Sequence, residues 1–287
     1  MKAAKSKAAR RARLVVDGLG LGESPRWHDG RLYLSDWVKR QIIAINGEGM
    51  IEIIARLDAM PFSFAFLPDG RMALLAGSEL SIRRADGGFA AHADLSALSH
   101  KPWNEIVVDG RGRAFVNTIG FDFPGGEFRP GLVASVAADG VARIVADDVA
   151  FPNGMAVSPD NQTLVLAESY ANQLTAFTIG SVGQLMDRRS FAEIPGHYPD
   201  GITMDAEGAV WFADVPGRNC TRVAEGGAIL DRVTVDRGCF ACTLGGAEGT
   251  TLYIAAADWN GPEAIGSTAP SGQVLAVEVD VPRAGWP

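Results

Sequence analysis

Residues 28–36 read His-Asp-Gly-Arg-Leu-Tyr-Leu-Ser-Asp, a polar turn with glycine followed by a short, mostly apolar segment. A turn of this kind between short apolar segments predicts a β-hairpin. The same phrase recurs five more times along the chain. The Gly or Asn that marks each turn falls at Gly30, Gly70, Gly110, Asn161, Gly208 and Gly249, with spacings of 40, 40, 51, 47 and 41 residues.

This spacing is the length of a propeller blade. No stretch of the chain shows a sustained helical period, so helical repeats of similar length are disfavoured. The 274 residues after the first 13, divided by six, come to about 46 per repeat, which suits four-stranded blades. We therefore predict an all-β fold, a six-bladed β-propeller, closed by pairing of residues 14–16 with residues 273–277. Closure would remove the exposed sheet edges.

Composition and charge limit the function classes. Of the 287 residues, 26 are Lys or Arg and 34 are Asp or Glu, which gives a net charge of −8. Residues 1–13 hold six of the basic side chains and no acid, so the rest carries 20 − 34 = −14. Such a body repels nucleic acid. No apolar stretch approaches the ~20 residues of a membrane helix.

The same features predict the domain organisation. We expect residues 1–13 to form a disordered basic arm, with a transit peptide or an anionic docking arm as alternatives, and residues 14–287 to form one domain. No apolar segment follows the basic residues, so a secretory signal is not expected. Three cysteines, Cys220, Cys239 and Cys242, predict free core thiols in a reducing compartment. We expect a cytoplasmic protein, a monomer or weak homo-oligomer.

Polar residues recur at one phase of the repeat, about seven residues before each turn marker. The positions are Glu23, Phe62/Ser63, Asn104, Asn153, Asp200 and Cys242. In a propeller this phase lies on the innermost strands, around the central channel. Asn153 and Asp200 stand in the frames Pro-Asn-Gly and Pro-Asp-Gly, and Glu23 stands in Gly-Glu-Ser-Pro. One such tripeptide alone is turn chemistry; recurrence at one phase predicts a shared site.

Two carboxylates and a carboxamide are oxygen ligands that suit a hard divalent cation such as Ca²⁺ or Mg²⁺. Without a cation, two carboxylates packed together would repel each other and raise one pKa. A bound cation could polarise an ester or lactone carbonyl and activate water. Hydrolysis is the chemistry that this arrangement favours.

The chain resembles the gluconolactonase, regucalcin and senescence-marker-protein family of six-bladed propellers. The resemblance covers residues 14–277 and rests on Glu23 ahead of Pro25-x-Trp27, on the two tripeptides around Asn153 and Asp200, and on Thr243-Leu-Gly-Gly246. It implies a lactonase that opens sugar lactones. It implies metal ligation by Glu23, Asn153 and Asp200, with Asp200 also the general base and Asn104 a further metal or substrate contact. The implied metal is Ca²⁺ first, then Zn²⁺, Mg²⁺ or Mn²⁺.

One segment departs from the family pattern. Where animal members read Arg-x-Asn-Asp, this chain has Pro102-Trp-Asn-Glu105. A sugar-hydroxyl contact could be lost, Lys101 could reach the same space, or the substrate could be less hydroxylated than an aldonolactone. Trp103, Phe121, Tyr198 and Trp259 are expected at the channel mouth, with plain blade packing as the alternative; Lys101, Trp103, Tyr198 and Asn104 form the predicted substrate set.

Other functions stay open on the same scaffold. A calcium-binding propeller without catalysis is one, and phosphotriester hydrolysis or an isomerisation at the same metal is another. His197, three residues before Asp200, is a candidate proton relay or a surface residue. Glu168 and Asp214 end strands near the axis and are candidate supports of the site.

Overall fold

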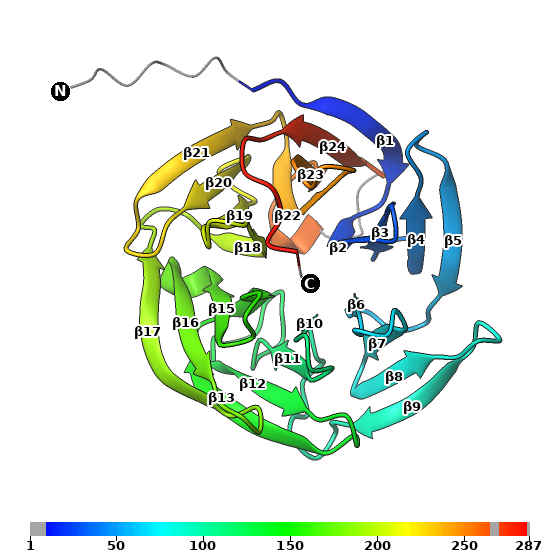
Figure 1. Cartoon of the computed structure of the whole chain (residues 1–287), viewed down its shortest axis with the longest axis vertical. Helices are drawn as coiled ribbons and strands as arrows, with labels where there is room; N and C mark the ends of the chain where they lie inside the picture. The colour runs from blue at the N-terminus through cyan, green and yellow to red at the C-terminus, as the bar shows by residue number, and fades with distance from the viewer. Residues whose placement is uncertain (1–9, 265–269, 286–287) are drawn as a thin grey trace.

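The computed structural model describes residues 10–264 and 270–285, and its strands form six four-stranded antiparallel sheets arranged in a ring (Figure 1). The predicted six-bladed propeller is confirmed. Blade 1 comprises β2 (Gly22–His28), β3 (Arg31–Asp36), β4 (Gln41–Ile45) and β5 (Ile51–Arg56). Blade 2 comprises β6 (Phe62–Phe66), β7 (Met72–Ala76), β8 (Glu79–Arg83) and β9 (Phe89–Asp94). Blade 3 comprises β10 (Glu105–Val108), β11 (Ala114–Thr118), β12 (Gly131–Val136) and β13 (Ala142–Val149).

The second half of the ring repeats this order. Blade 4 comprises β14 (Pro152–Val157), β15 (Thr163–Glu168), β16 (Gln173–Ile179) and β17 (Leu185–Glu193), with the 3-10 helix η1 (Ser169–Ala171). Blade 5 comprises β18 (Pro199–Met204), β19 (Val210–Asp214), β20 (Asn219–Val223) and β21 (Ile229–Thr234). Blade 6 comprises β22 (Gly238–Gly245), β23 (Thr251–Ala257), β24 (Gly272–Glu278) and the N-terminal β1 (Arg13–Leu19), with η2 (Pro262–Ala264).

The ring closes between the two ends of the chain, as the sequence predicted. Strand β1 pairs with β24, with Leu14 opposite Leu275 and Val16 opposite Val274. In Figure 1 the blue β1 is the outermost strand of blade 6, beside the red β24. Because β1 supplies the fourth strand of a blade whose other strands come from the end of the chain, the pairing ties the first blade to the last.

Each repeat marker lies in the turn between the first two strands of a blade. Gly30, Gly70, Asn161, Gly208 and Gly249 all have positive φ, between 60° and 84°. Glycine and asparagine adopt this left-handed conformation at least cost. In blade 3 the positive φ falls at Gly112 instead of Gly110. These hairpins lie on one face of the disc, which we call the lower face; the innermost strands begin on the opposite, upper face.

The start of the chain is partly described. Residues 1–9 lie outside the described residues, so predicted disorder there stays a prediction. Arg10 donates hydrogen bonds to the carboxylates of Asp231 at 2.8 Å and Asp280 at 2.8 Å, and β1 begins at Arg13. Among the described residues no helix is long and apolar enough to cross a membrane.

Candidate functional site

Three predicted residues lie at the start of innermost strands: Glu23 on β2, Asn153 on β14 and Asp200 on β18. Each of these strands has a register shift against its neighbour at that position. The shifts fall between Glu23 and Arg26, between Pro152 and Met155, and between Pro199 and Ile202. Such a β-bulge re-aims a side chain and interrupts the ladder. The prolines of the three frames therefore lie where the strand ladder is already interrupted, so the N–H that proline lacks removes few ladder hydrogen bonds.

The glycines of the two tripeptides let neighbouring strands approach. A Cβ added to Gly154 would lie 2.6 Å from the carbonyl oxygen of Asp200 and 2.6 Å from the amide nitrogen of Ile202. A Cβ on Gly201 would lie 2.5 Å from the Cβ of Ala241 on β22. Only glycine fits such contacts. Gly154 thereby brings β14 against β18, and with it Asn153 beside Asp200.

Carboxyl groups from three blades influence one another here. Burial raises the pKa of Glu23 well above its usual range, and the carboxylates of Asp200 and Glu105 raise it further. Burial likewise raises the pKa of Asp200, Glu105 adds to the effect, and a hydrogen bond with the Asn153 side chain opposes it. The structure thus brings Glu23, Asn153 and Asp200 into one electrostatic cluster and adds Glu105 to it.

Glu105 differs from the other two carboxylates because it has a cation of its own. Its Oε1 accepts from Arg26 Nη2 at 3.1 Å, and its Oε2 accepts from the Ser24 hydroxyl at 3.1 Å. Burial raises the pKa of Glu105, while Arg26 and these hydrogen bonds lower it. Arg26 also donates to the Ile106 carbonyl at 2.8 Å, which fixes its guanidinium. Glu105 is therefore already neutralised by the chain.

Asn153 is oriented by a residue that the sequence did not single out. Asn117, on β11, donates from Nδ2 to the Asn153 carbonyl at 2.7 Å. Its own Oδ1 is buried without a hydrogen-bond partner among the described residues. Asn117 ends a second strand rather than an innermost one, so it lies outside the phase that located the others. The register that places it opposite Glu105 was the missing signal.

The donor set fits a divalent cation. Glu23 and Asp200 have raised pKa values and no hydrogen-bonded cation of their own among the described residues, and Asn153 adds a neutral oxygen. Asn153 and Asp200 are partly accessible, so water and ligands could reach them. Within residues 10–264 and 270–285 no three side chains of the His, Cys, Asp and Glu types are arranged to hold a metal. The candidate ligands are instead two carboxylates and a carboxamide.

The predicted substrate residues have different environments. Asn104 is partly accessible and its backbone N–H donates to the Asn117 carbonyl at 2.7 Å. Lys101 Nζ donates to Asp122 Oδ1 at 2.7 Å, and Tyr198 is 46% exposed. Trp103 has no exposed surface and packs in the core shared by blades 2 and 3. In this structure the Trp103 ring offers no surface to a substrate, which is the packing alternative that the sequence left open.

Buried acids hold the loops beside the site. Glu168 accepts from the Ala150 N–H at 2.7 Å and from Arg188 at 2.9 Å, just ahead of Asn153. Asp214 accepts from His197 Nδ1 at 2.5 Å, and Arg232 donates to His197 Nε2 at 3.2 Å. Both ring nitrogens of His197 therefore have partners on blade 5. Both acids act on neighbouring chain segments, as supports would.

The cysteines supply no side chain to this cluster, although Cys242 Sγ donates to the Gly201 carbonyl at 3.7 Å, next to Asp200. All three are free and buried, at Cys220, Cys239 and Cys242. Burial and the neighbouring thiols raise the pKa of Cys220 well above its usual range. They behave as the core thiols that the sequence predicted.

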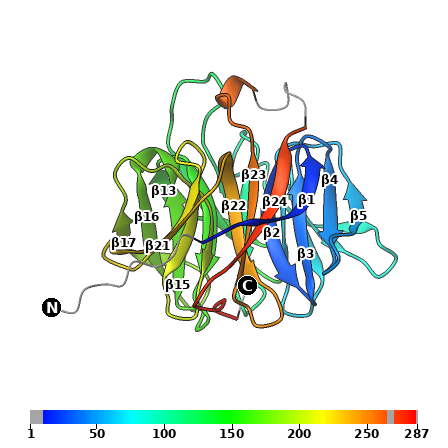
Figure 2. The ribbon, with the colours of Figure 1, turned by 90° about the horizontal axis from the view of Figure 1, so that it is seen from above.

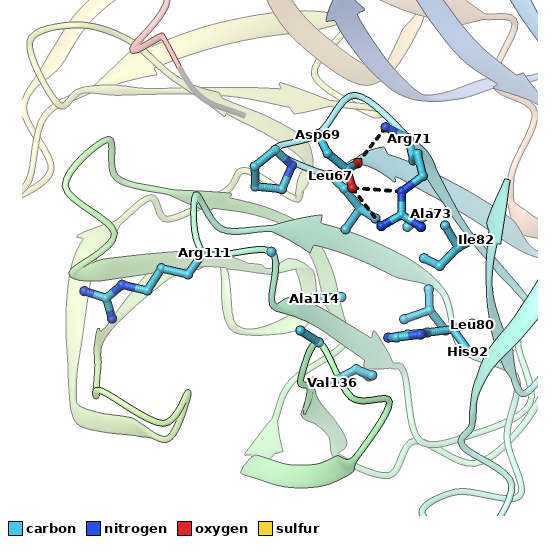
Figure 3. A pocket seen from close by; sticks show the side chains of 13 residues that line it. Leu67, Asp69, Arg71, Ala73, Leu80, Ile82, His92, Arg111, Ala114 and Val136 are labelled. Atoms are coloured by element: carbon cyan, nitrogen blue, oxygen red, sulfur yellow. Dashed lines mark hydrogen bonds and ion pairs between the residues drawn. The ribbon is translucent and has the colours of Figure 1, made fainter. Parts of the chain in front are cut away.

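A cavity of about 390 Å³ opens on the lower face, between blades 2 and 3 (Figure 3). Its apolar walls include Leu80 and Ile82, and Asp69 pairs with Arg71 at its rim. It contains none of the predicted site residues. The cavity lies at the hairpin turns, the other end of the strands from Glu23, Asn153 and Asp200.

Comparison with known proteins finds a family match over most of the chain. Residues 21–258 match the family described as the SMP-30/gluconolactonase/LRE-like region. A 6-deoxy-6-sulfogluconolactonase of Pseudomonas putida is 26% identical over 276 residues, covering 93% of this chain and 94% of that protein. A pentonolactonase of Haloferax volcanii is 26% identical, covering 78% of this chain and 83% of that protein.

Among solved structures, a calcium-binding regucalcin from Agrobacterium tumefaciens superposes with a TM-score of 0.83. It is 21% identical and the match covers 97% of both chains. This likeness concerns the fold.

Proposed function

The chain belongs to the SMP-30/gluconolactonase/LRE-like family, and from this premise we propose that it is a divalent-metal-dependent lactonase acting at Glu23, Asn153 and Asp200. The observation that carries the proposal is the pair of carboxyls with raised pKa, Glu23 and Asp200, on the innermost strands. The names of the two relatives, a sulfogluconolactonase and a pentonolactonase, support a lactone as substrate.

In the proposed reaction, Glu23, Asn153 and Asp200 hold the cation. A bound divalent cation supplies polarisation of the lactone carbonyl and stabilises the negative charge that develops on its oxygen. Ca²⁺ suits an all-oxygen set, and Zn²⁺, Mg²⁺ or Mn²⁺ are alternatives. Asn117 holds the Asn153 segment in place through its 2.7 Å hydrogen bond.

Asp200 acts as the general base. Its carboxylate removes a proton from the attacking water, whose oxygen forms a bond to the carbonyl carbon. The ring C–O bond then breaks, the ring oxygen takes up a proton, and an open-chain hydroxy acid leaves. In the metal-free chain, burial and Glu105 raise the pKa of Asp200. We propose that Asn104, which is partly accessible, contacts the substrate, with Lys101 and Tyr198 as further contacts.

The test is Asp200→Ala, with Asp139→Ala on an exposed lower-face turn as the control. We expect Asp200→Ala to lower kcat/KM for a lactone by about 10³-fold and to abolish cation binding measured by calorimetry. Asp139→Ala should match the parent in both. Retention of both metal binding and turnover in Asp200→Ala would refute the proposal.

A second candidate is a calcium-binding propeller without catalysis. It is favoured by the Agrobacterium regucalcin, which is described as a calcium-binding protein. Chelation separates the two: a structural calcium site predicts a lower Tm after chelation and no lactone hydrolysis before or after it. The cytoplasmic location and the monomeric or weakly oligomeric state stay proposals.

A further inference from the structure

Five aromatic side chains form one contiguous cluster on the upper face, on blades 3 and 4. We call it the aromatic wall; its members are Phe121, Phe123, Phe128, Phe151 and Tyr170. The ring centroids of contacting members lie 4.6 to 6.2 Å apart. Three members come from the loop between β11 and β12, and two come from the ends of the loops that flank β14 and β15.

The wall adjoins the candidate site through the backbone. Phe151 is two residues before Asn153, and the Tyr170 N–H donates to the Ala150 carbonyl at 3.1 Å. Ser169 donates from Oγ to the Pro199 carbonyl at 2.7 Å, next to Asp200. Two wall members, Phe151 and Tyr170, are therefore tied to the strand starts that carry Asn153 and Asp200, on the same face.

Only part of the wall is needed for packing. Phe121 and Phe151 are buried, but Phe128 is 46% exposed and Tyr170 is 47% exposed. Large apolar side chains gathered on a surface beside a polar site are typical of a ligand-binding surface. The exposed rings lie on the buried ones, so the wall presents a preformed apolar surface.

The loop that carries three wall members reaches across the face. A Cβ placed on Gly125 would lie 3.9 Å from Oε1 of Glu263, on η2 of blade 6. Blades 3 and 6 are opposite each other in a ring of six, so these segments meet above the channel side of the disc. Figure 2 shows η2 and the loop between β11 and β12 rising on the same side. The contact between these two segments covers part of the upper face.

One charged side chain of the loop that carries three wall members is paired, whereas Glu127 and Arg129 on the same loop are exposed. Lys101 donates to Asp122, which lies between two wall phenylalanines, and Glu105 is held by Arg26 and Ser24. An apolar group placed against the exposed Phe128 and Tyr170 rings gains from burial.

We propose that the substrate of this site is a lactone with an apolar substituent, aromatic or alkyl, which lies against the aromatic wall while its carbonyl lies at Glu23, Asn153 and Asp200. This inference rests on the proposed lactonase function. It assigns the substrate class: a ring ester whose substituent carries few hydroxyls, rather than a polyhydroxylated aldonolactone. The reaction is unchanged, since the substituent contributes binding energy only.

The experiment compares three lactones of one ring size on the metal-loaded protein with a pH indicator: γ-phenyl-γ-butyrolactone, γ-butyrolactone and galactono-γ-lactone. Burying about 80 Å² of the phenyl ring predicts a kcat/KM about 30-fold above that of the unsubstituted ring. Galactono-γ-lactone should be slower than γ-phenyl-γ-butyrolactone by at least about tenfold, since its hydroxyls meet apolar rings.

Tyr170→Ala and Phe128→Ala test the wall without opening the core, because both side chains are exposed. Each should lower the ratio of kcat/KM for the phenyl-substituted over the unsubstituted lactone by about fivefold, mainly through KM. Ile229→Ala, an exposed apolar residue on the outer strand of blade 5, is the matched control and should leave the ratio unchanged.

The outcomes are distinguishable. Faster hydrolysis of galactono-γ-lactone than of γ-phenyl-γ-butyrolactone overturns the assigned substrate class and leaves the lactonase proposal standing. An unchanged ratio in both wall variants overturns the role of the wall. Hydrolysis of no lactone with any of the four cations overturns the lactonase proposal, and the substrate class with it.

Discussion

The innermost strands of this propeller are of two kinds, although one repeat encodes them all. Strands β2, β14 and β18 have a bulge at Glu23, Asn153 and Asp200, whereas β6 and β10 pair with their neighbours without a register shift. The three candidate metal ligands therefore lie on the bulged strands. Strand β22 is bulged too, near Cys239, but its side chains there are apolar. A bulge thus aims a side chain, and the residue type decides whether the result is a ligand.

A buried carboxylate also has different electrostatic partners on the two kinds of strand. Glu23, on a bulged strand, has other carboxylates as its main electrostatic neighbours, and its pKa is raised well above the usual range. Glu105, on a straight strand, has Arg26 as its partner at 3.1 Å. One carboxylate has no hydrogen-bonded cation among the described residues, and the other is paired with Arg26 within the chain. Four experiments can break or sharpen this contrast.

The largest effect is expected where the bulged strands touch. Gly154→Ala places a Cβ 2.6 Å from two backbone atoms of β18, so β14 must move away. We expect a loss of about 3 kcal/mol in the free energy of unfolding, measured by urea denaturation, and a weaker cation affinity. Gly47→Ala is the control, since nothing lies within 4 Å of its Cβ. Equal stability of the two variants would contradict the close approach.

A smaller effect is expected on the straight strand. Glu105→Gln keeps the volume but removes the countercharge of Arg26, which is only 17% exposed. We expect a loss of about 2 kcal/mol in unfolding free energy. Glu52→Gln breaks the surface pair with Arg31 and should cost under about 0.5 kcal/mol. Comparable losses in both variants would show that the buried Glu105–Arg26 pair stabilises the fold no more than the surface pair does.

The raised pKa values predict how stability depends on pH in protein stripped of metal. Because the folded state binds the Glu23 proton more tightly than the unfolded state, its contribution falls as pH rises above the ordinary carboxyl range. Glu23→Gln has no carboxyl group to ionise at this position. The free energy of unfolding of the variant, relative to the parent, should therefore increase between about pH 5 and pH 8. The increase is at most about 1.4 kcal/mol for each pH unit. Adding the cation should stabilise the parent only. A pH-independent difference would argue against an uncompensated carboxylate.

The smallest effect is expected at Ser63, which occupies on straight β6 the phase that Glu23 occupies on β2. Its hydroxyl is buried without a hydrogen-bond partner among the described residues. Ser63→Ala should leave kcat/KM unchanged and should stabilise the fold by less than about 1 kcal/mol, measured by thermal unfolding. A large loss of turnover would show that straight strands also supply site residues.

The repeat made much of this architecture predictable. Turn residues such as Gly30 and Gly208 set the hairpins, and the strand partners of residues 14–16 follow from ring closure, so number, order and closure of blades could be predicted. The phase of Glu23, Asn153 and Asp200 within the repeat also follows from counting. Counting failed for Asn117, because its place beside Asn153 depends on contact between different blades.

The environment of Trp103 was likewise not predictable from the sequence. An aromatic residue next to Asn104 suits either a channel mouth or a core, and only packing between blades 2 and 3 decides that it has no exposed surface. The contacts within the aromatic wall could not be predicted either. Its members are up to 49 residues apart, and they meet through loops whose sequences are not part of the repeat.

The amino-acid sequence alone determined the blade count, the closure and the phase at which polar residues face the axis, because these follow from local turn chemistry repeated at one period. Tertiary structure alone decided which carboxylate is paired with Arg26, which has no such partner among the described residues, and which aromatic rings meet on the upper face. The physical reason is that charge pairing and packing depend on distances between blades, and no local periodicity encodes those distances.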